Sequence, residues 1–282
     1  VIDGEILVSA YDLHYDKLTG PFDFAEAIFL DSGGYEAGKD VELSDTQSRE
    51  HIPAAWTLDD YNSIVAGWQS PRPTVIVSYD HPNERVPVSE QIARADQTIP
   101  RKANIFREIL FKPATADEPE TDVNAIVKNI HALAAFDAIG VTEKEIGGTQ
   151  QARMGSIARI RRALNDAGLG NKPIHVFGSL DTISTPLYFV AGADIFDGLT
   201  WLRFAYYEGL TIYRQNFAAK RFGTQIKSNL VEARCSFENY YYMKRMQLEM
   251  RNFLGSQSFD SFSHHKELIE GAYRATAEET EA

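Results

Sequence analysis

Residues 137–177 read DAIGVTEKEIGGTQQARMGSIARIRRALNDAGLGNKPIHVF, and this stretch decides the fold. It contains two short apolar runs, Asp137–Val141 and Pro173–Phe177, which are typical of buried strands. Between them, Ala152–Ala167 carries apolar residues at helical spacing and is followed by Gly168, a common helix terminator. A strand, a helix and a second strand in this order predict a βαβ unit with two parallel strands.

The same alternation continues along the chain. Seven or eight strand–helix units favour an α/β protein built on a closed (β/α)8 TIM barrel, which we predict over residues 1–225. Residues 226–282 read as helical, and we predict that they pack on the same domain as a C-terminal extension. A second helix is predicted at Ile126–Ala135. The other predicted strands are Glu5–Ser9, Ala27–Asp31, Thr74–Asp80, Arg107–Lys112, Asp194–Asp197 and a weaker one near Leu210–Tyr213.

Composition narrows the class of protein. The 282 residues are 44% hydrophobic, yet no run reaches the roughly 20 apolar residues of a membrane helix, so we expect no membrane association. Cys235 is the only cysteine, which rules out an intrachain disulfide and a cysteine-rich zinc site and favours a reducing, cytoplasmic compartment. The formal net charge of −12 argues against a general nucleic-acid coat, but it leaves room for a local basic face.

Three predicted strands end in an aspartate: Asp31, Asp80 and Asp197. In a barrel of this kind the carboxyl ends of the strands form one rim, where chemistry is found. Each residue also has a structural interpretation. Asp31 could start a tight turn, Asp80 could cap a helix, and Asp194 and Asp197 could be a salt-bridge partner and a turn former. Three carboxylates on one rim favour a functional site, because like charges that converge destabilise a fold.

Two chemistries suit such a set. A magnesium ion accepts carboxylate ligands. Alternatively, one carboxylate attacks the anomeric carbon of a sugar while a second carries a proton to and from the departing group. The adjacent Gly33 and Gly34 would let a substrate approach the backbone closely.

The motifs DSGGYE (31–36), SYDHP (78–82), HVFG (175–178) and GADIFD (192–197) together resemble those of the tRNA-guanine transglycosylases. These are (β/α)8-barrel enzymes that exchange a guanine in RNA for a 7-deazaguanine base. The likeness extends in order from about residue 27 to residue 203. The phrases GVTEKEIG and DGLTWLR are similar to the divergent bacterial branch, which includes transglycosylases of DNA and paralogues found near antiphage-defence genes.

The resemblance implies a role for each matched residue. Asp197 would be the nucleophile that attacks C1′, Asp31 the general acid and base, and Asp80 the carboxylate that reads the guanine edge. Arg203 would contact the nucleic acid. The remaining base-binding positions would be Ser32, Gly33, Gly34, Lys112, Gly140, Glu145 and His175.

The chain also departs from the family pattern. Lys112 stands where the family has a glutamine before Gly-Gly, and the family's cysteine-rich zinc motif is missing. We therefore expect no metal and no cofactor, and we favour DNA over tRNA as the nucleic acid that receives the 7-deazaguanine. A protein partner or a homodimer would supply further surface. Two alternatives remain open: a non-catalytic partner subunit of a transglycosylase complex, and a carboxylate-metal hydrolase on the same barrel.

Overall fold

The computed structural model describes residues 4–38, 52–81 and 84–281, and Pro82 of the SYDHP motif lies outside this range. Its central feature is a parallel sheet of seven strands that follow one another in chain order. The mixed α/β class and the parallel sheet predicted from the sequence are thereby confirmed. The strands are β1 (Glu5–Ser9), β2 (Ala27–Asp31), β3 (Thr74–Val77), β4 (Ile105–Phe111), β5 (Ala138–Thr142), β6 (Ile174–Phe177) and β7 (Ile195–Phe196).

The sheet curls into a half-barrel. The rings of Phe29 on β2 and His175 on β6 lie 5.6 Å apart between centroids, although these strands are four positions apart in the sheet. In a flat sheet the same strands would be separated by about 19 Å. Val77, Leu110 and Phe177, from β3, β4 and β6, form a further cluster on the concave side. Side chains at alternate positions of the strands therefore converge inside the curl.

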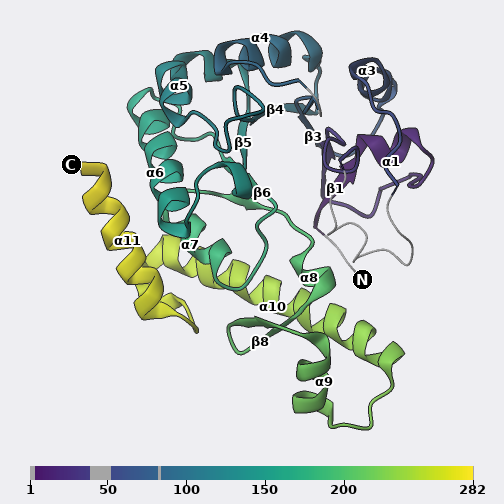
Figure 1. Cartoon of the computed structure of the whole chain (residues 1–282), viewed down its shortest axis with the longest axis vertical. Coiled ribbons are helices and arrows are strands. Elements are labelled where there is room, and N and C mark those ends of the chain that lie inside the picture. The colour runs from purple at the N-terminus through teal and green to yellow at the C-terminus, as the bar shows by residue number, and fades with distance from the viewer. Residues whose placement is uncertain (1–3, 39–51, 82–83, 282) are drawn as a thin grey trace.

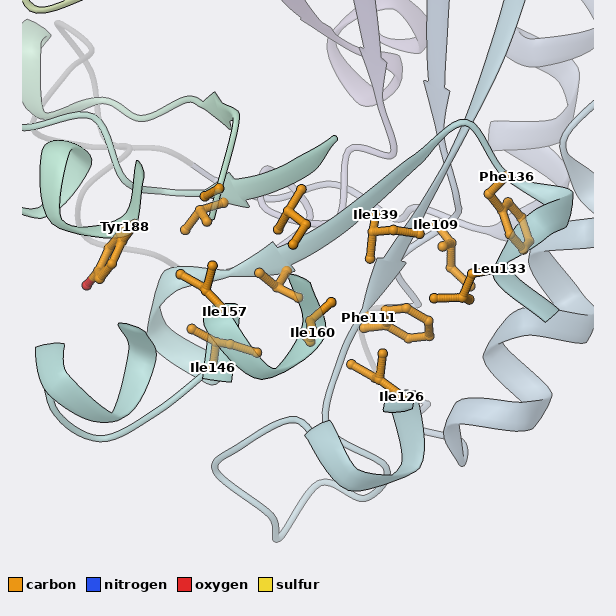
Figure 2. Packing of buried hydrophobic residues seen from close by; sticks show 14 of the residues in the cluster. Ile109, Phe111, Ile126, Leu133, Phe136, Ile139, Ile146, Ile157, Ile160 and Tyr188 are labelled. Atoms are coloured by element: carbon orange, nitrogen blue, oxygen red, sulfur yellow. The ribbon is translucent and has the colours of Figure 1, made fainter. Parts of the chain in front are cut away.

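Helices cover the convex side of the sheet (Figure 1). The main hydrophobic core lies between these helices and the sheet. Figure 2 shows Ile109, Phe111 and Ile139 of the sheet near helical side chains such as Ile157 and Ile160. The helices that link the strands are α1 (Ala10–His14), α3 (Leu58–Gly67), α4 (Val88–Thr98), α5 (Val123–Lys128), η1 (Ile130–Ala135), η2 (Glu143–Glu145), α6 (Gln150–Asp166) and α7 (Ser184–Val190).

Helix α6 shows how the sequence sets this packing. The Thr149 hydroxyl accepts a hydrogen bond from the Ala152 backbone N–H at 3.1 Å and caps the first turn. Gly168 adopts a φ of +72° just beyond the last turn, a conformation in which glycine ends helices at little cost. The residues buried between these points are Met154, Ile157, Ile160 and Leu164, and each stabilises the fold by about 1.5–3 kcal/mol relative to exposure.

The predicted helix Ile126–Ala135 is two shorter elements, α5 and η1. They meet at Asn129, whose side-chain amide donates to the Ala125 carbonyl at 2.8 Å. An asparagine that bonds its own backbone competes with continued α-helix, which accounts for the change to 3-10 geometry.

The weaker strand predicted near Leu210–Tyr213 does not join the parallel sheet. It is β9 (Leu210–Ile212), which pairs antiparallel with β8 (Ala205–Tyr207) in a separate hairpin. Glu208 and Gly209 both have positive φ angles, +48° and +82°, which match the two-residue turn that suits the twist of a hairpin. Two residues are too few for the crossover that a parallel strand needs. Among the described residues β7 pairs with β6 and makes no pairing with β1.

The remainder of the chain is helical beyond this hairpin. The elements are α8 (Thr200–Arg203), α9 (Arg214–Phe222), α10 (Ser228–Ser256), η3 (Phe259–Ser261) and α11 (Lys266–Glu281). Helix α10 contacts α7, α8 and β8, while α11 packs on α6 and α7 (Figure 1). Buried Asn239 of α10 accepts from the Tyr206 N–H at 2.7 Å and donates to the carbonyls of Trp201 and Phe204. In the part of the chain that the structure describes, every helix is too short or too polar to cross a membrane.

Candidate functional site

Asp31 is the last residue of β2 and lies at the carboxyl-end rim, with 8% of its surface exposed. Its Oδ2 accepts a hydrogen bond from the Gly33 backbone N–H at 3.1 Å. Gly33 has a φ of +79°, and a Cβ atom there would lie 2.5 Å from the Tyr11 Cβ. A glycine is therefore required at 33, both for the conformation and for the space.

The surroundings of Asp31 favour its neutral form. Burial is the main cause, and the negative charges of Asp197 and Asp80 add to it, while the Gly33 N–H partly offsets them; together they raise the pKa of Asp31 to about 6. The structure therefore brings the three predicted aspartates close enough to interact. A carboxyl group with a pKa near neutral can both give and take a proton at physiological pH.

A second carboxyl group, that of Glu36, lies five residues further along the same motif; the residue is half-buried, and its Oε2 is enclosed. Burial, followed by the negative charge of Asp31, raises the pKa of Glu36 to about 8. Glu36 is therefore mostly protonated at neutral pH, and it lies close enough to Asp31 to be affected by its charge. Glu36 was not predicted from DSGGYE; the available signal was a second carboxylate two residues after Gly34.

Asp197 follows β7 directly and stands at the same rim, with 27% of its side chain exposed. Its Oδ1 accepts from the Gly178 backbone N–H at 3.2 Å and lies 3.3 Å from His175 Nε2. Asp194 has different surroundings. It pairs with Arg161 of α6 and accepts from the Ile174 N–H at 2.9 Å, so it ties β6 and α6 together. The two aspartates of GADIFD thus have separate positions, one at the rim and one at the opposite end of the strand.

Asp80, Lys112 and Glu145 form a charged network beside this rim. Lys112 Nζ lies 2.5 Å from Glu145 Oε2 and 3.4 Å from Asp80 Oδ2. Arg85, which sequence reasoning missed, donates to Asp80 Oδ1 at 2.7 Å. Lys112 directly follows β4, Glu145 ends η2, and Asp80 and Arg85 lie in the segment after β3. Two carboxylates and two cations therefore stand together, and a polar ligand could exchange partners with them.

A pocket of about 180 Å3 opens beside this network and is lined by Ser78, Asp80, Arg85 and Lys112. It extends toward α4 rather than over Asp197. Gly34 packs closely against Asp80, since a Cβ at position 34 would lie 2.9 Å from Asp80 Oδ2.

The other predicted residues lie in three environments. Ser32 is buried, and its carbonyl accepts from the Trp56 indole N–H at 2.9 Å. Gly140 lies on β5, where a Cβ would meet Glu108 Oε1 and the Phe177 ring. Arg203 ends α8, with its guanidinium 5.3 Å from the centre of the Phe204 ring. The structure therefore brings together Asp31, Asp80 and Asp197, and it leaves Arg203 on a separate element.

Glu108 of β4 is the most notable residue that the sequence analysis missed. It is fully buried on the concave side, where its Oε1 lies 2.9 Å from His175 Nδ1. Burial alone would lower the pKa of His175, but the carboxylates of Glu108 and Asp197 outweigh it and raise that pKa to about 10. A glutamate next to an arginine inside the apolar run IFREILF was the available signal.

Within the described residues, no group of three or more His, Cys, Asp or Glu side chains is arranged to hold a metal ion. The rim offers an acid with a near-neutral pKa, a second carboxylate held by a backbone N–H beside an imidazole, and a charged pocket. Comparison of the chain with models of known protein families and with curated proteins finds no match.

Proposed function

We propose that this protein is a base-exchanging N-glycosyl transferase that replaces a guanine in nucleic acid with a 7-deazaguanine. The observation that carries the proposal is that Asp31 and Asp197 lie close enough for the charge of Asp197 to raise the pKa of Asp31. One carboxyl group is buried, with a pKa of about 6, and the other is partly exposed and anchored through one oxygen. Two neighbouring carboxylates in different environments are what a retaining displacement at a sugar carbon requires.

The reaction has two balanced steps. In the first, Asp197 forms a bond to C1′ as the bond from C1′ to the guanine nitrogen breaks, and Asp31 gives its proton to the departing base. In the second, Asp31 takes a proton from the incoming base, which attacks C1′ and expels Asp197 as a carboxylate. Asp31 ends protonated, as it began. Both halves reuse the same two groups, so the exchange is reversible.

The charged network supports recognition of a guanine-like base. Guanine offers N–H donors on one edge and a carbonyl acceptor nearby, which complement Asp80 and Lys112 respectively. The target nucleotide would have to leave its stack, because C1′ and the base edge cannot both be reached inside a duplex. We favour DNA as the nucleic acid. We further propose that the seven strands correspond to the greater part of a (β/α)8 barrel.

The test is exchange of labelled guanine into tRNA, single-stranded DNA and double-stranded DNA by the full chain. Asp197→Asn should abolish exchange and the covalent adduct seen after denaturation. Asp194→Asn is the matched control, since it alters the neighbouring carboxylate outside the rim. Absence of exchange into every polymer, with the folded wild-type protein, would overturn the proposal.

A further inference from the structure

Three side chains cross the concave side of the sheet in a line. Glu108 comes from β4, His175 from β6 and Asp197 from the end of β7. His175 Nδ1 lies 2.9 Å from Glu108 Oε1, and His175 Nε2 lies 3.3 Å from Asp197 Oδ1. The Nδ1 contact is a hydrogen bond, whereas Nε2 is buried and lies at ion-pair distance from Asp197 without a hydrogen bond among the described residues. The His175 side chain is 1% exposed and that of Glu108 is 0% exposed, so solvent does not screen the first pair.

The packing fixes the imidazole in this orientation. The Phe177 ring stacks on it at 3.8 Å between centroids, and the Phe29 ring meets it edge-on at 5.6 Å. Gly140 makes the room for Glu108, because a Cβ at 140 would lie 2.8 Å from Glu108 Oε1 and 2.8 Å from the Phe177 ring. The line of contacts is therefore held by residues of β2, β4, β5 and β6, together with Asp197 directly after β7.

The charges inside this line have to balance. Glu108 Oε2 is buried and has no hydrogen-bond partner among the described residues, so His175 faces a carboxylate that no solvent stabilises. An isolated buried charge is costly, whereas an imidazolium between two carboxylates offsets it. The charged groups that face His175 are Glu108 from β4 and Asp197 from β7, while Phe29 and Gly140 face it from β2 and β5.

The contacts also distinguish the two oxygens of Asp197. Both His175 Nε2 and the Gly178 N–H approach Oδ1. Oδ2 is then the oxygen that is left to attack. When it bonds to C1′, Oδ1 becomes the carbonyl of the ester. When that bond breaks, the electron pair returns to the carboxylate, next to a cation that is already in place.

We propose that Glu108 holds His175 as a cation, and that His175 positions Asp197 and stabilises the negative charge that returns to it when the glycosyl ester breaks down. This inference rests on the proposed function. Glu108 and His175 are positioning residues, and the proton stays on His175 throughout. Their loss should therefore slow breakdown of the ester more than binding of the substrate.

The first test is independent of activity. In the 15N-histidine-labelled full chain, we would follow the ring nitrogens of each histidine by NMR from pH 5.5 to 9, with His175→Gln to assign the signal. Both nitrogens of His175 should remain protonated beyond pH 8 in the wild-type protein, and Glu108→Gln should lower the titration midpoint. Titration of wild-type His175 near its ordinary value of 6.5 would overturn the inference, whether or not any variant folds.

The second test uses exchange kinetics. Glu108→Gln should lower kcat by about 100-fold, the range for loss of a preorganised donor, with KM changed by less than about threefold. The fraction of protein trapped as covalent adduct should rise. Asp194→Asn is the control and should match the wild type. Unchanged kcat and adduct level in Glu108→Gln would refute the role of the pair. If the wild-type protein itself never exchanges a base, the proposed function fails, and the titration alone decides whether the charged line exists.

Discussion

Replacement of Asp31 by asparagine should stabilise the protein while removing its activity. Asp31 is almost fully buried, and its carboxylate faces the negative charges of Asp197 and Asp80. Asparagine has nearly the same shape and keeps an oxygen that can accept from the Gly33 N–H. The substitution therefore removes an unfavourable charge without opening a cavity.

The magnitude follows from the pKa of Asp31, which rises from 3.8 to about 6 on folding. The folded value lies above the unfolded one, so the stabilising contribution of the proton is complete below pH 4 and is lost as pH rises through 6. The charged form at pH 8 thus costs up to about 3 kcal/mol. Asp31→Asn should be more stable than the wild type by up to this amount at pH 8. The advantage should shrink by about 1.4 kcal/mol at pH 5.

Equilibrium unfolding in urea at pH 5, 6.5 and 8 measures this difference for both proteins. Asp194→Asn serves as the control for removal of a carboxylate from an ion pair outside the rim. The same samples should show no base exchange by Asp31→Asn at any pH. A variant that is equally stable or less stable at pH 8, or an advantage that does not change with pH, would refute the electrostatic reasoning about this rim.

Three further substitutions test other parts of the structure. Asp194→Asn should leave base exchange within about twofold of the wild type, since Asp194 pairs with Arg161 away from the rim. It should lower the free energy of unfolding by no more than about 1 kcal/mol. A loss of exchange comparable to that of Asp197→Asn would show that the roles of the two aspartates are reversed. Gly140→Ala should destabilise the protein by about 1–3 kcal/mol, because the added Cβ would lie 2.8 Å from Glu108 Oε1 and from the Phe177 ring. Its thermal unfolding should be compared with that of Gly67→Ala, where no atom lies within 4 Å, and equal midpoints would contradict the tight packing. Asn239→Ala should cost about 2–4 kcal/mol in urea unfolding, because it removes one buried and two partly buried hydrogen bonds that join α10 to residues 201–206. An unchanged midpoint would mean that the hairpin is held by other contacts.

Local sequence determines most of the fold. The strands Glu5–Ser9 and Ala27–Asp31 have the predicted bounds, and the other strands of the parallel sheet differ by one to three residues at their ends. The reason is physical: short apolar runs between helical repeats can be buried only as parallel strands covered by helices. The prediction near Leu210–Tyr213 was wrong in its pairing, because a two-residue turn makes this strand part of an antiparallel hairpin rather than of the parallel sheet.

The candidate site, like the fold, can be predicted from the sequence only in part. Placement of Asp31, Asp80 and Asp197 at strand ends follows from the sequence, because the carboxyl ends of parallel strands share one edge. The effect of Asp80 and Asp197 on the pKa of Asp31 does not, since it depends on burial and on the distances between side chains at the end of β2 and after β3 and β7.

Glu108 shows what only the tertiary structure decided. In the sequence it is one charged residue beside Arg107, and the two differ only in the face of β4 that each occupies. Alternation along β4 places Arg107 on the outside, against the carbonyls of Ala135 and Asp96, and Glu108 on the inside. The curl of the sheet then brings Glu108 onto His175 of a strand two positions away. Sequence patterns report which residues can be buried; the pairing of buried charges depends on curvature, which arises from the whole sheet at once.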